Sequence, residues 1–267
     1  MTPPELSIII STIGAPEIEK VVSTFLASSV PLEVVVVLDK PDLHPDSIFS
    51  TETINDPRLK IIINECNLGA TRSFNKAIAA SMGAIMVRAD DDDIPAPNRL
   101  DEILHFFQEH PNVDIVYSYA TGVDKATGRS WRIEGPQQDV DIKAKLPRKN
   151  FIVHASLAFR RGKLAQIGFY DETFRFAQDY DLYLRAIRAG FTFGCIPKVL
   201  VTRYYHPDSI TVKRRKRQIL NSMAARLLHC ALSEKRENPW PIIARYCKLL
   251  LIPNWARKLK RKIGFGT

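Results

Sequence analysis

Four consecutive aspartates, Asp90 to Asp93, come directly after a short apolar stretch and just before two prolines. Adjacent carboxylates repel one another, so such a run has either a structural or a chemical reason. The structural interpretation is a solvated acidic turn in front of the helix expected from Asn98. The chemical interpretation is a divalent cation site, because carboxylate oxygens are hard ligands suited to Mg²⁺ or Mn²⁺. In an extended segment, Asp90 and Asp92 would point to one side and Asp91 and Asp93 to the other.

Short apolar runs alternate with segments of helical periodicity through the first half of the chain. Continuous apolar runs of this length suit strands that are covered on both faces. The expected strands span residues 6–12, 32–39, 59–64 and 84–90, with helices at 16–28 and 70–82 between them. This alternation predicts an α/β fold with a doubly wound, mostly parallel, Rossmann-like sheet.

Acidic residues stand at the carboxyl ends of two of these strands. Asp39 ends the second strand, and Asp90 to Asp93 end the fourth. Ligands of doubly wound sheets bind beyond the carboxyl ends of the strands. Two strands that deliver carboxylates to one rim favour the cation site over an accidental acidic turn.

The later part of the chain continues with a helix at 98–108 and a hairpin of strands at 113–124 and 130–135. Residues 136–150 are polar and irregular, and we expect a loop there. Order resumes over 151–205, with a helix near 163–167 and an amphipathic helix at 179–191. We therefore expect one catalytic domain over residues 1–212.

The charge distribution separates a basic tail from this domain. The chain carries 38 Lys and Arg and 29 Asp and Glu, a net charge of +9. Residues 213–267 hold 15 of the basic and two of the acidic residues, a net +13, which leaves −4 for residues 1–212. Clustered Lys and Arg among Leu, Ile, Trp and Phe are typical of helices on an anionic membrane surface. The alternative is a helix packed on the domain, and nucleic acid is not an expected partner.

Cysteine usage and the N-terminus indicate a cytoplasmic protein. The four cysteines lie far apart, with no pattern typical of zinc or of a disulfide framework. The N-terminus lacks the basic start and long apolar run of a signal peptide. No stretch approaches the roughly 18 apolar residues of a membrane-spanning helix. We expect a cytoplasmic protein, able to attach peripherally to the cytoplasmic face of a membrane.

Three segments in order resemble family 2 of the glycosyltransferases, whose A-type fold binds nucleotide-diphospho-sugars. "NLGATRSFNKAIAASMGAIMVRADDDDIPAPNRL" is similar to the family's stretch from an Asn-x-Gly turn to its Asp-x-Asp motif. "HASLAFRRGKLAQIGFYDETFRFAQDYDLYLRA" resembles its acceptor-side segment, and "YYHPDSIT" its closing His-containing loop. One Asp-x-Asp motif alone is weak evidence for a family, but three motifs in register over residues 6 to about 210 are strong evidence for this resemblance.

The resemblance implies a metal site and a donor site. The metal ligands would be Asp90, Asp92 and His206, holding Mn²⁺ or Mg²⁺ against the departing diphosphate. The donor-binding residues would be Thr12, Asp39, Asn67, Arg72, Asp90 and Asp91. The residues themselves leave simpler roles open: a turn for Asp39 and Asn67, and a surface salt bridge for Arg72.

The resemblance also implies a general base. Asp179, at the start of the helix at 179–191, would remove the proton from the acceptor hydroxyl. The residue types alone also permit Asp179 to cap that helix. Gln178 stands where the family usually has Glu. We place His154 and Asp181 on the acceptor side, with a supporting role in the fold as the alternative for Asp181.

The sequence thus predicts an inverting, metal-dependent glycosyltransferase that moves a sugar from a nucleotide-diphospho-sugar, UDP-linked, to a glycan or lipid-linked acceptor. The expected process is synthesis of a surface polysaccharide. Two alternatives stay open at this stage. A nucleotidyltransferase would use a similar sheet but needs a Gly-rich basic loop, which "STIGAPEIEK" does not supply. A non-catalytic membrane-surface protein with a vestigial metal site would account for Gln178.

Overall fold

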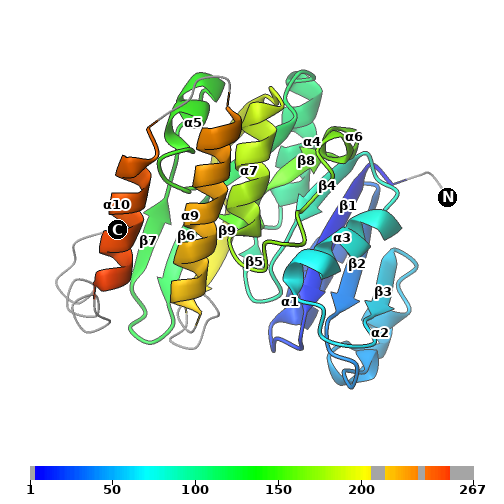
Figure 1. Cartoon of the computed structure of the whole chain (residues 1–267). Helices are drawn as coiled ribbons and strands as arrows, with labels where there is room; N and C mark the ends of the chain where they lie inside the picture. Colours follow the sequence, from blue (N-terminus) through cyan, green and yellow to red (C-terminus); the bar gives the residue numbers. More distant parts are fainter. Residues whose placement is uncertain (1–3, 206–213, 234–237, 253–267) are drawn as a thin grey trace.

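One mixed sheet with helices on both faces forms the body of the protein (Figure 1). The structure is a computed structural model, and it describes residues 4–205, 214–233 and 238–252. The described residues form a nine-stranded sheet in the order β3-β2-β1-β4-β8-β6-β9-β5, with β7 paired to β6. This is the predicted α/β architecture of the A type.

The first four strands form the parallel part of the sheet. β1 pairs with β2 and β4, and β2 pairs with β3, all in parallel. The predicted strands and the helices between them are confirmed, with bounds that differ by one or two residues. The elements of this half are β1 (Leu6–Thr12), α1 (Ile18–Leu26), β2 (Leu32–Leu38), η1 (Pro45–Ser47), α2 (Thr51–Ile54), β3 (Leu59–Ile63), α3 (Ala70–Ala80) and β4 (Ile85–Arg88).

The second half of the sheet mixes parallel and antiparallel pairs. β8 runs antiparallel between β4 and β6, while β6 and the long β9 pair in parallel. The elements up to the last strand are β5 (Ile94–Pro95), α4 (Arg99–Glu109), β6 (Ile115–Asp124), β7 (Ser130–Ile133), α5 (Asp139–Lys145), η2 (His154–Ser156), β8 (Ala158–Arg160), α6 (Arg161–Gln166), α7 (Gln178–Arg188) and β9 (Phe193–Tyr205).

Our expectation of a loop over residues 136–150 was wrong, because α5 occupies Asp139–Lys145. Its apolar content is small, but Ile142 and the following Leu146 are fully buried in the core. Asp139 accepts a hydrogen bond from the Phe193 amide at 2.8 Å and pairs with Lys143. Tertiary burial of two side chains therefore outweighs the polar composition of the segment.

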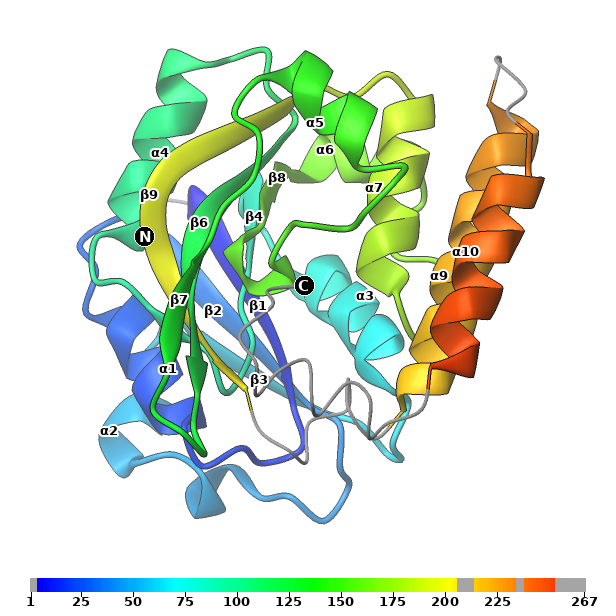
Figure 2. The same ribbon diagram turned by 90° about the vertical axis from the view of Figure 1, so that its left-hand side faces the viewer.

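Alternation along the strands divides the apolar residues between two cores. Ile8 and Ile10 of β1 point toward α1 and α4, whereas Ile9 points toward α3 and α7. β2 divides its valines in the same way. Because both faces are covered, every residue of β2 is buried. Figure 2 shows α1 and α4 on one face of the sheet and α3, α6 and α7 on the other.

The tail forms two helices that pack on the domain. α9 (Arg215–Leu232) lies between α7 and α10 (Trp240–Leu251) in both views (Figures 1 and 2). Ala225 of α9 joins Leu184 of α7 in one apolar cluster, and Cys230 joins Tyr246 of α10 in another. Packing on the body, which the sequence left as an alternative, therefore holds for the described part of the tail.

The described helices include none with the length and apolar content that crossing a bilayer requires. No disulfide joins the four cysteines, all of which lie in the described part of the chain.

Candidate active site

A cavity of about 950 Å³ opens beyond the carboxyl end of β4. Asp90 and Asp179, which lie 89 residues apart in the sequence, both line it. The start of α3 forms another part of its wall, β7 contributes a run of residues from Trp131 on, and the first turn of α9 supplies Arg217. The predicted donor side, the predicted base and the tail therefore meet at one opening.

Three carboxylates gather at the end of β4. One oxygen from each of Asp90, Asp92 and Asp93 lies within 4.8 Å of the others. We expected Asp93 on the opposite side from Asp90 and Asp92, and this was wrong. The chain bends at residues 91–93 instead of continuing as an extended strand, so simple alternation does not apply.

The burial of Asp93 fits a bound cation. Asp93 is 4% exposed, its Oδ1 accepts a hydrogen bond from the Tyr204 amide at 3.1 Å, and its Oδ2 has no hydrogen-bond partner. Burial and the neighbouring charge of Asp90 raise its pKa well above the usual range. A buried carboxylate oxygen without a partner is costly. A divalent cation would satisfy it, and the all-oxygen ligand set suits Mg²⁺ or Mn²⁺.

Two arginines hold Asp90 in its ionised form. Burial opposes the charge of Asp90, but the nearby positive charges outweigh burial and lower its pKa. Arg88 contributes most of this effect, with Nη1 2.6 Å from Asp90 Oδ1. Arg88 is itself 3% exposed, with its guanidinium 4.3 Å from the centre of the Phe74 ring. Arg203 of β9 acts on Asp90 from the other side of the cavity.

Thr12 links the first loop to the aspartate run. Its hydroxyl oxygen accepts hydrogen bonds from the amides of Gly14 at 2.9 Å and Ala15 at 3.3 Å. It also forms a hydrogen bond with Asp91, which moderates the effect of burial; burial raises the pKa of Asp91 to about 7. Thr12 and Asp91 thus order the loop at the expected donor side.

Asp39 organises the turn that begins α3. Its Oδ1 accepts hydrogen bonds from Asn64 Nδ2 at 2.8 Å and the Leu68 amide at 2.7 Å, and its Oδ2 accepts one from the Gly69 amide at 2.9 Å. Asn67 donates to the backbone oxygen of Asp39 at 2.9 Å. Gly69 has a φ of 86°, a conformation that L side chains rarely adopt. Asp39 and Asn67, which were both expected to bind the sugar donor, therefore also hold this turn together.

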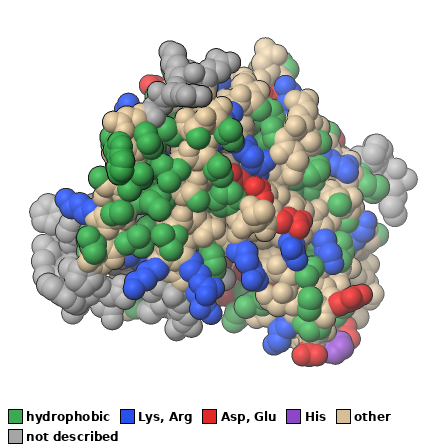
Figure 3. Space-filling view, in the orientation of Figure 1, with side chains coloured by type: hydrophobic (Ala, Val, Ile, Leu, Met, Phe, Trp, Pro, Cys, Tyr) green, Lys and Arg blue, Asp and Glu red, His purple; other side chains and the backbone are tan. Residues whose placement is uncertain are grey.

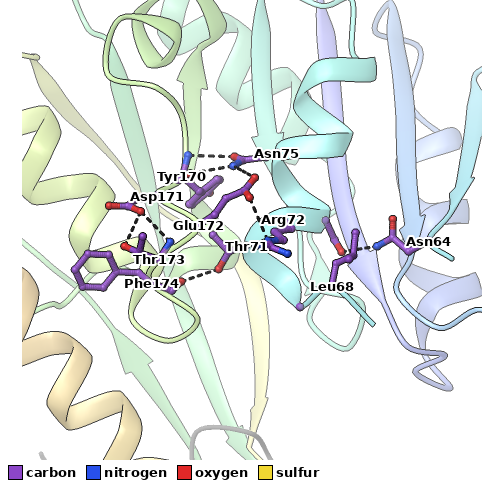
Figure 4. Close-up of polar contacts among 12 residues, drawn as sticks. Asn64, Leu68, Thr71, Arg72, Asn75, Tyr170, Asp171, Glu172, Thr173 and Phe174 are labelled. Carbon is purple, nitrogen blue, oxygen red and sulfur yellow. Dashed lines mark hydrogen bonds and ion pairs between the residues drawn. The ribbon is translucent and has the colours of Figure 1, made fainter. Parts of the chain in front are cut away.

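Arg72, one of the expected donor-binding residues, forms an ion pair with a neighbouring loop. Its Nε pairs with Glu172 at 3.1 Å, and both side chains are about half exposed. This pair belongs to a set of contacts between α3 and the loop 170–174 (Figure 4). Asn75 exchanges hydrogen bonds with both main-chain groups of Tyr170, and Thr71 donates to the Phe174 oxygen at 2.8 Å. The structure shows the surface salt bridge that the sequence allowed as a simpler role for Arg72.

These contacts fix the loop that leads to Asp179. Asp179 is the second residue of α7, and Ala177, with φ 55°, stands at the N-cap position. Asp179 is therefore not the N-cap residue itself, although its carboxylate accepts hydrogen bonds from backbone amides of the first turn. A left-handed alanine costs about 1 kcal/mol, and it turns the chain so that Gln178 and Asp179 line the cavity. Backbone strain of this kind is often found at functional sites.

Asp179 lies in a desolvated position, where Asn150, backbone amides of its own helical turn and the charge of Arg203 act on its carboxylate. Asn150 Nδ2 donates a hydrogen bond to its Oδ2 at 2.8 Å. Burial raises the pKa of Asp179, and the hydrogen bond from Asn150 partly offsets that rise. Such a carboxylate is a stronger proton acceptor than one in water.

The remaining expected residues have different surroundings. His154 lines the cavity, and its Nε2 lies 2.8 Å from the Tyr170 hydroxyl; burial lowers its pKa well below the usual value. Asp181 is 4% exposed and pairs with Arg185 at 2.7 Å, and Arg185 donates to the oxygens of Ile167 and Phe169. Asp181 therefore supports the fold instead of facing an acceptor. His206 lies outside the described residues.

Sequence reasoning missed several residues of the site. Asn150 stands in the segment taken for a loop, and nothing in its surroundings pointed to Asp179. Arg203 lies in a strand whose pairing with β6 the sequence did not reveal. Arg88 did leave a signal, since an arginine inside an apolar strand two residues before a carboxylate cluster indicates a buried ion pair.

Comparisons with known proteins agree on one family. The sequence profile described as Glycosyl transferase family 2 matches residues 7–168. An uncharacterized glycosyltransferase of Methanocaldococcus jannaschii is 28% identical over 229 residues, covering 83% of this chain and 78% of the relative. The amylovoran biosynthesis glycosyltransferase AmsE of Erwinia amylovora is 26% identical over 203 residues, covering 76% and 75%.

A third relative has a named reaction. The UDP-Gal:alpha-D-GlcNAc-diphosphoundecaprenol beta-1,3-galactosyltransferase of Escherichia coli is 27% identical over 161 residues, covering 57% of this chain and 54% of the relative.

Solved structures share the fold at low sequence identity. S. aureus TarS 1-349 in complex with UDP-GlcNAc superposes with a TM-score of 0.70 and 16% identity, covering 98% of this chain and 76% of that fragment. The mannosyltransferase PcManGT of Pyrobaculum calidifontis, in complex with GDP-Man and Mn²⁺, gives a TM-score of 0.62 and 19% identity, covering 99% and 76%.

Proposed function

Because the chain belongs to glycosyltransferase family 2, we propose that it transfers a sugar from a UDP-sugar to a hydroxyl of a glycan or lipid-linked acceptor, with inversion at the anomeric carbon. The observation that carries this proposal is that Asp90 and Asp179 line one cavity. In this proposal Asp90 lies on the side where the diphosphate leaves, and Asp179 lies where the acceptor hydroxyl loses its proton. Membership of the family removes the nucleotidyltransferase alternative.

The donor end of the site is the carboxylate cluster. Asp90, Asp92 and Asp93 would hold Mn²⁺ or Mg²⁺, which would neutralise the diphosphate as it departs. Arg88 keeps Asp90 ionised, and the turn built by Asp39 and Asn67 borders the donor. The UDP-sugar named for the Escherichia coli relative and the UDP-GlcNAc bound to TarS support a UDP-linked donor. The Mn²⁺ bound to PcManGT supports the cation.

The acceptor end is Asp179. The acceptor oxygen forms a bond to the anomeric carbon as the bond from that carbon to the diphosphate oxygen breaks. The proton of the acceptor hydroxyl passes to Asp179, whose raised pKa suits a general base. A single displacement with one base inverts the anomeric configuration, by the same geometry that separates inverting from retaining hydrolases.

We further propose that α9 contacts an anionic membrane surface, where a lipid-linked acceptor would lie. Leu220, Ala224, Leu228 and Leu232 repeat every four residues along one exposed face of α9, following Lys216. Leu228 is 45% exposed and Leu232 65%. Figure 3 shows hydrophobic side chains gathered over α9 and α10 with Lys and Arg at their border. Apolar side chains beside basic ones match the interface of an anionic membrane.

Asp92→Ala should weaken Mn²⁺-dependent binding of UDP by about tenfold or more, the scale of a damaged metal site. Isothermal titration of UDP with and without Mn²⁺ measures this, beside UDP release from a panel of UDP-sugars. Asp101→Ala, an exposed aspartate of α4, is the matched control. Equal UDP affinity in Asp92→Ala and the native protein would contradict the ligand assignment. Failure of the native protein to release UDP from any donor would contradict the proposed activity.

Asp179→Asn should retain UDP and Mn²⁺ binding but lose transfer by about 10²-fold or more, because the amide cannot accept the acceptor proton. Both kcat for transfer and the dissociation constant of UDP are measured for the variant and the native protein. Asp141→Asn on the exposed face of α5 should leave both quantities unchanged. Near-native kcat in Asp179→Asn would remove this residue from the role of base.

Asn150→Ala should move the acidic limb of the pH–rate profile to higher pH. The Asn150 hydrogen bond stabilises ionised Asp179, so its loss raises the pKa of Asp179 further, and protonation then blocks the base at a higher pH. The profile of kcat/KM against pH measures the shift. Asn98→Ala, an exposed asparagine, serves as control. A limb that stays in place, or moves to lower pH, would speak against Asp179 as the titrating group.

Leu228→Glu should reduce sedimentation of the protein with vesicles of phosphatidylcholine and phosphatidylglycerol, because a carboxylate on the exposed face of α9 is repelled by anionic lipid. Native binding should weaken as salt is added, since charge attraction is screened. Met82→Glu places the same charge on an exposed side chain far from the tail and should bind as the native protein does. Equal binding of both variants would reject the membrane face.

A further inference from the structure

Trp131 forms part of the cavity wall opposite the expected donor side. β7 carries Trp131 and pairs with β6, so that Trp131 stands beside Gly122. β9 occupies one edge of β6, so β7 pairs on the edge that β8 also uses, three strand positions from β2, the strand that ends in Asp39. At roughly 4.8 Å per strand position, the indole lies three positions from the turn that Asp39 organises. It is 38% exposed, and it lines the cavity.

Two neighbours fix the indole in place. A Cβ atom on Gly122 would lie 2.5 Å from Cε2 of Trp131, so the ring rests on the backbone of Gly122 in a position that no other residue type would permit. The Tyr205 ring at the end of β9 packs against it, with centroids 5.0 Å apart and planes inclined by 39°. The Arg203 guanidinium lies 5.1 Å from the Tyr205 ring. The exposed indole is therefore held as a rigid surface.

The groups around the indole are polar. Arg203 and Tyr205 of β9 lie on the same face of the sheet as Trp131, because Gly122 pairs with both Trp131 and Arg203, and both line the same cavity. Beyond them, the wall continues through Asn150 to Asp179. A rigid aromatic ring bordered by hydrogen-bonding groups has an apolar face and a polar rim. A pyranose matches this surface, because its C–H groups form an apolar face and its hydroxyls point outward around the ring.

We propose that Trp131 is the platform for the acceptor sugar, whose C–H face packs on the indole while Arg203 and the other polar groups of this cavity wall bind its hydroxyls. This inference rests on the proposed function, and it assigns the acceptor a saccharide ring at the reacting end. The alternative occupant, an acyl chain, would need a continuous apolar wall, whereas the residues beside Trp131 are charged.

The test uses the full chain with Mn²⁺, the UDP-sugar that is hydrolysed fastest, and a panel of methyl pyranosides as acceptors. Trp131→Ala should raise the acceptor KM by about tenfold, the scale of a lost aromatic contact. Trp131→Phe should recover most of the loss, because a ring remains. UDP affinity and UDP release without acceptor should stay native in both. Trp240→Ala, a 71% exposed tryptophan of α10, is the control and should keep the native acceptor KM.

Binding is measured separately from turnover, through the indole N–H resonance that Trp131→Phe removes from the NMR spectrum. Methyl pyranosides should shift this resonance in the native protein saturated with UDP and Mn²⁺. An unchanged acceptor KM in Trp131→Ala, a matching loss of UDP affinity, or an indole resonance that no pyranoside shifts would each overturn the proposal. If no nucleotide sugar is hydrolysed, the proposed function fails, and the pyranoside titration still decides whether Trp131 binds a sugar.

Discussion

The crowding of like charges at the end of β4 is the constraint on which the site depends. Three carboxylates meet there within 4.8 Å, and one of them is almost fully buried. Such a cluster is stable only with positive charge beside it. Arg88 supplies part of that charge from inside the strand and Arg203 from β9, yet one oxygen of Asp93 still has no hydrogen-bond partner. A divalent cation would satisfy this oxygen, and it would connect the stability of this corner to the proposed donor binding.

A second constraint joins the two halves of the cavity. α3 follows the turn that Asp39 organises, and the same helix binds the loop 170–174 through Thr71, Arg72 and Asn75. That loop leads through the left-handed Ala177 into α7, which carries Asp179. The position of Asp179 therefore depends on the turn that Asp39 organises. A ligand that reorders the turn at Gly69 would act on Asp179 through a few packed residues.

The far wall of the cavity has a different origin. β6 and β7 extend past the parallel part of the sheet and bring Trp131, Arg132 and Glu134 to the opening, while α9 adds Arg217. These residues come from segments with no counterpart in a plain doubly wound sheet. The central strands and α7 thus position the carboxylate cluster and Asp179, and the added strands and helices form the rest of the cavity wall.

The sequence by itself determined the first half of this protein. Continuous apolar runs can be buried only between two helical layers, so β1, β2 and β4, and the carboxylates at the ends of β2 and β4, followed from local pattern alone. The order of three motifs indicated Asp179 as well, although its raised pKa comes from burial that no local pattern reports.

Tertiary structure decided the rest, because the deciding contacts join segments far apart in the chain. A bend at residues 91–93 brought Asp93 beside Asp90 and Asp92, and Arg72 pairs with Glu172 of a distant loop. Burial of Ile142 stabilises a helix in a polar segment. An ion pair with Arg185 accompanies the burial of Asp181. Periodicity describes which face a residue occupies on its own element. Charge pairing and burial depend on which other element that face meets, and only the folded chain sets that.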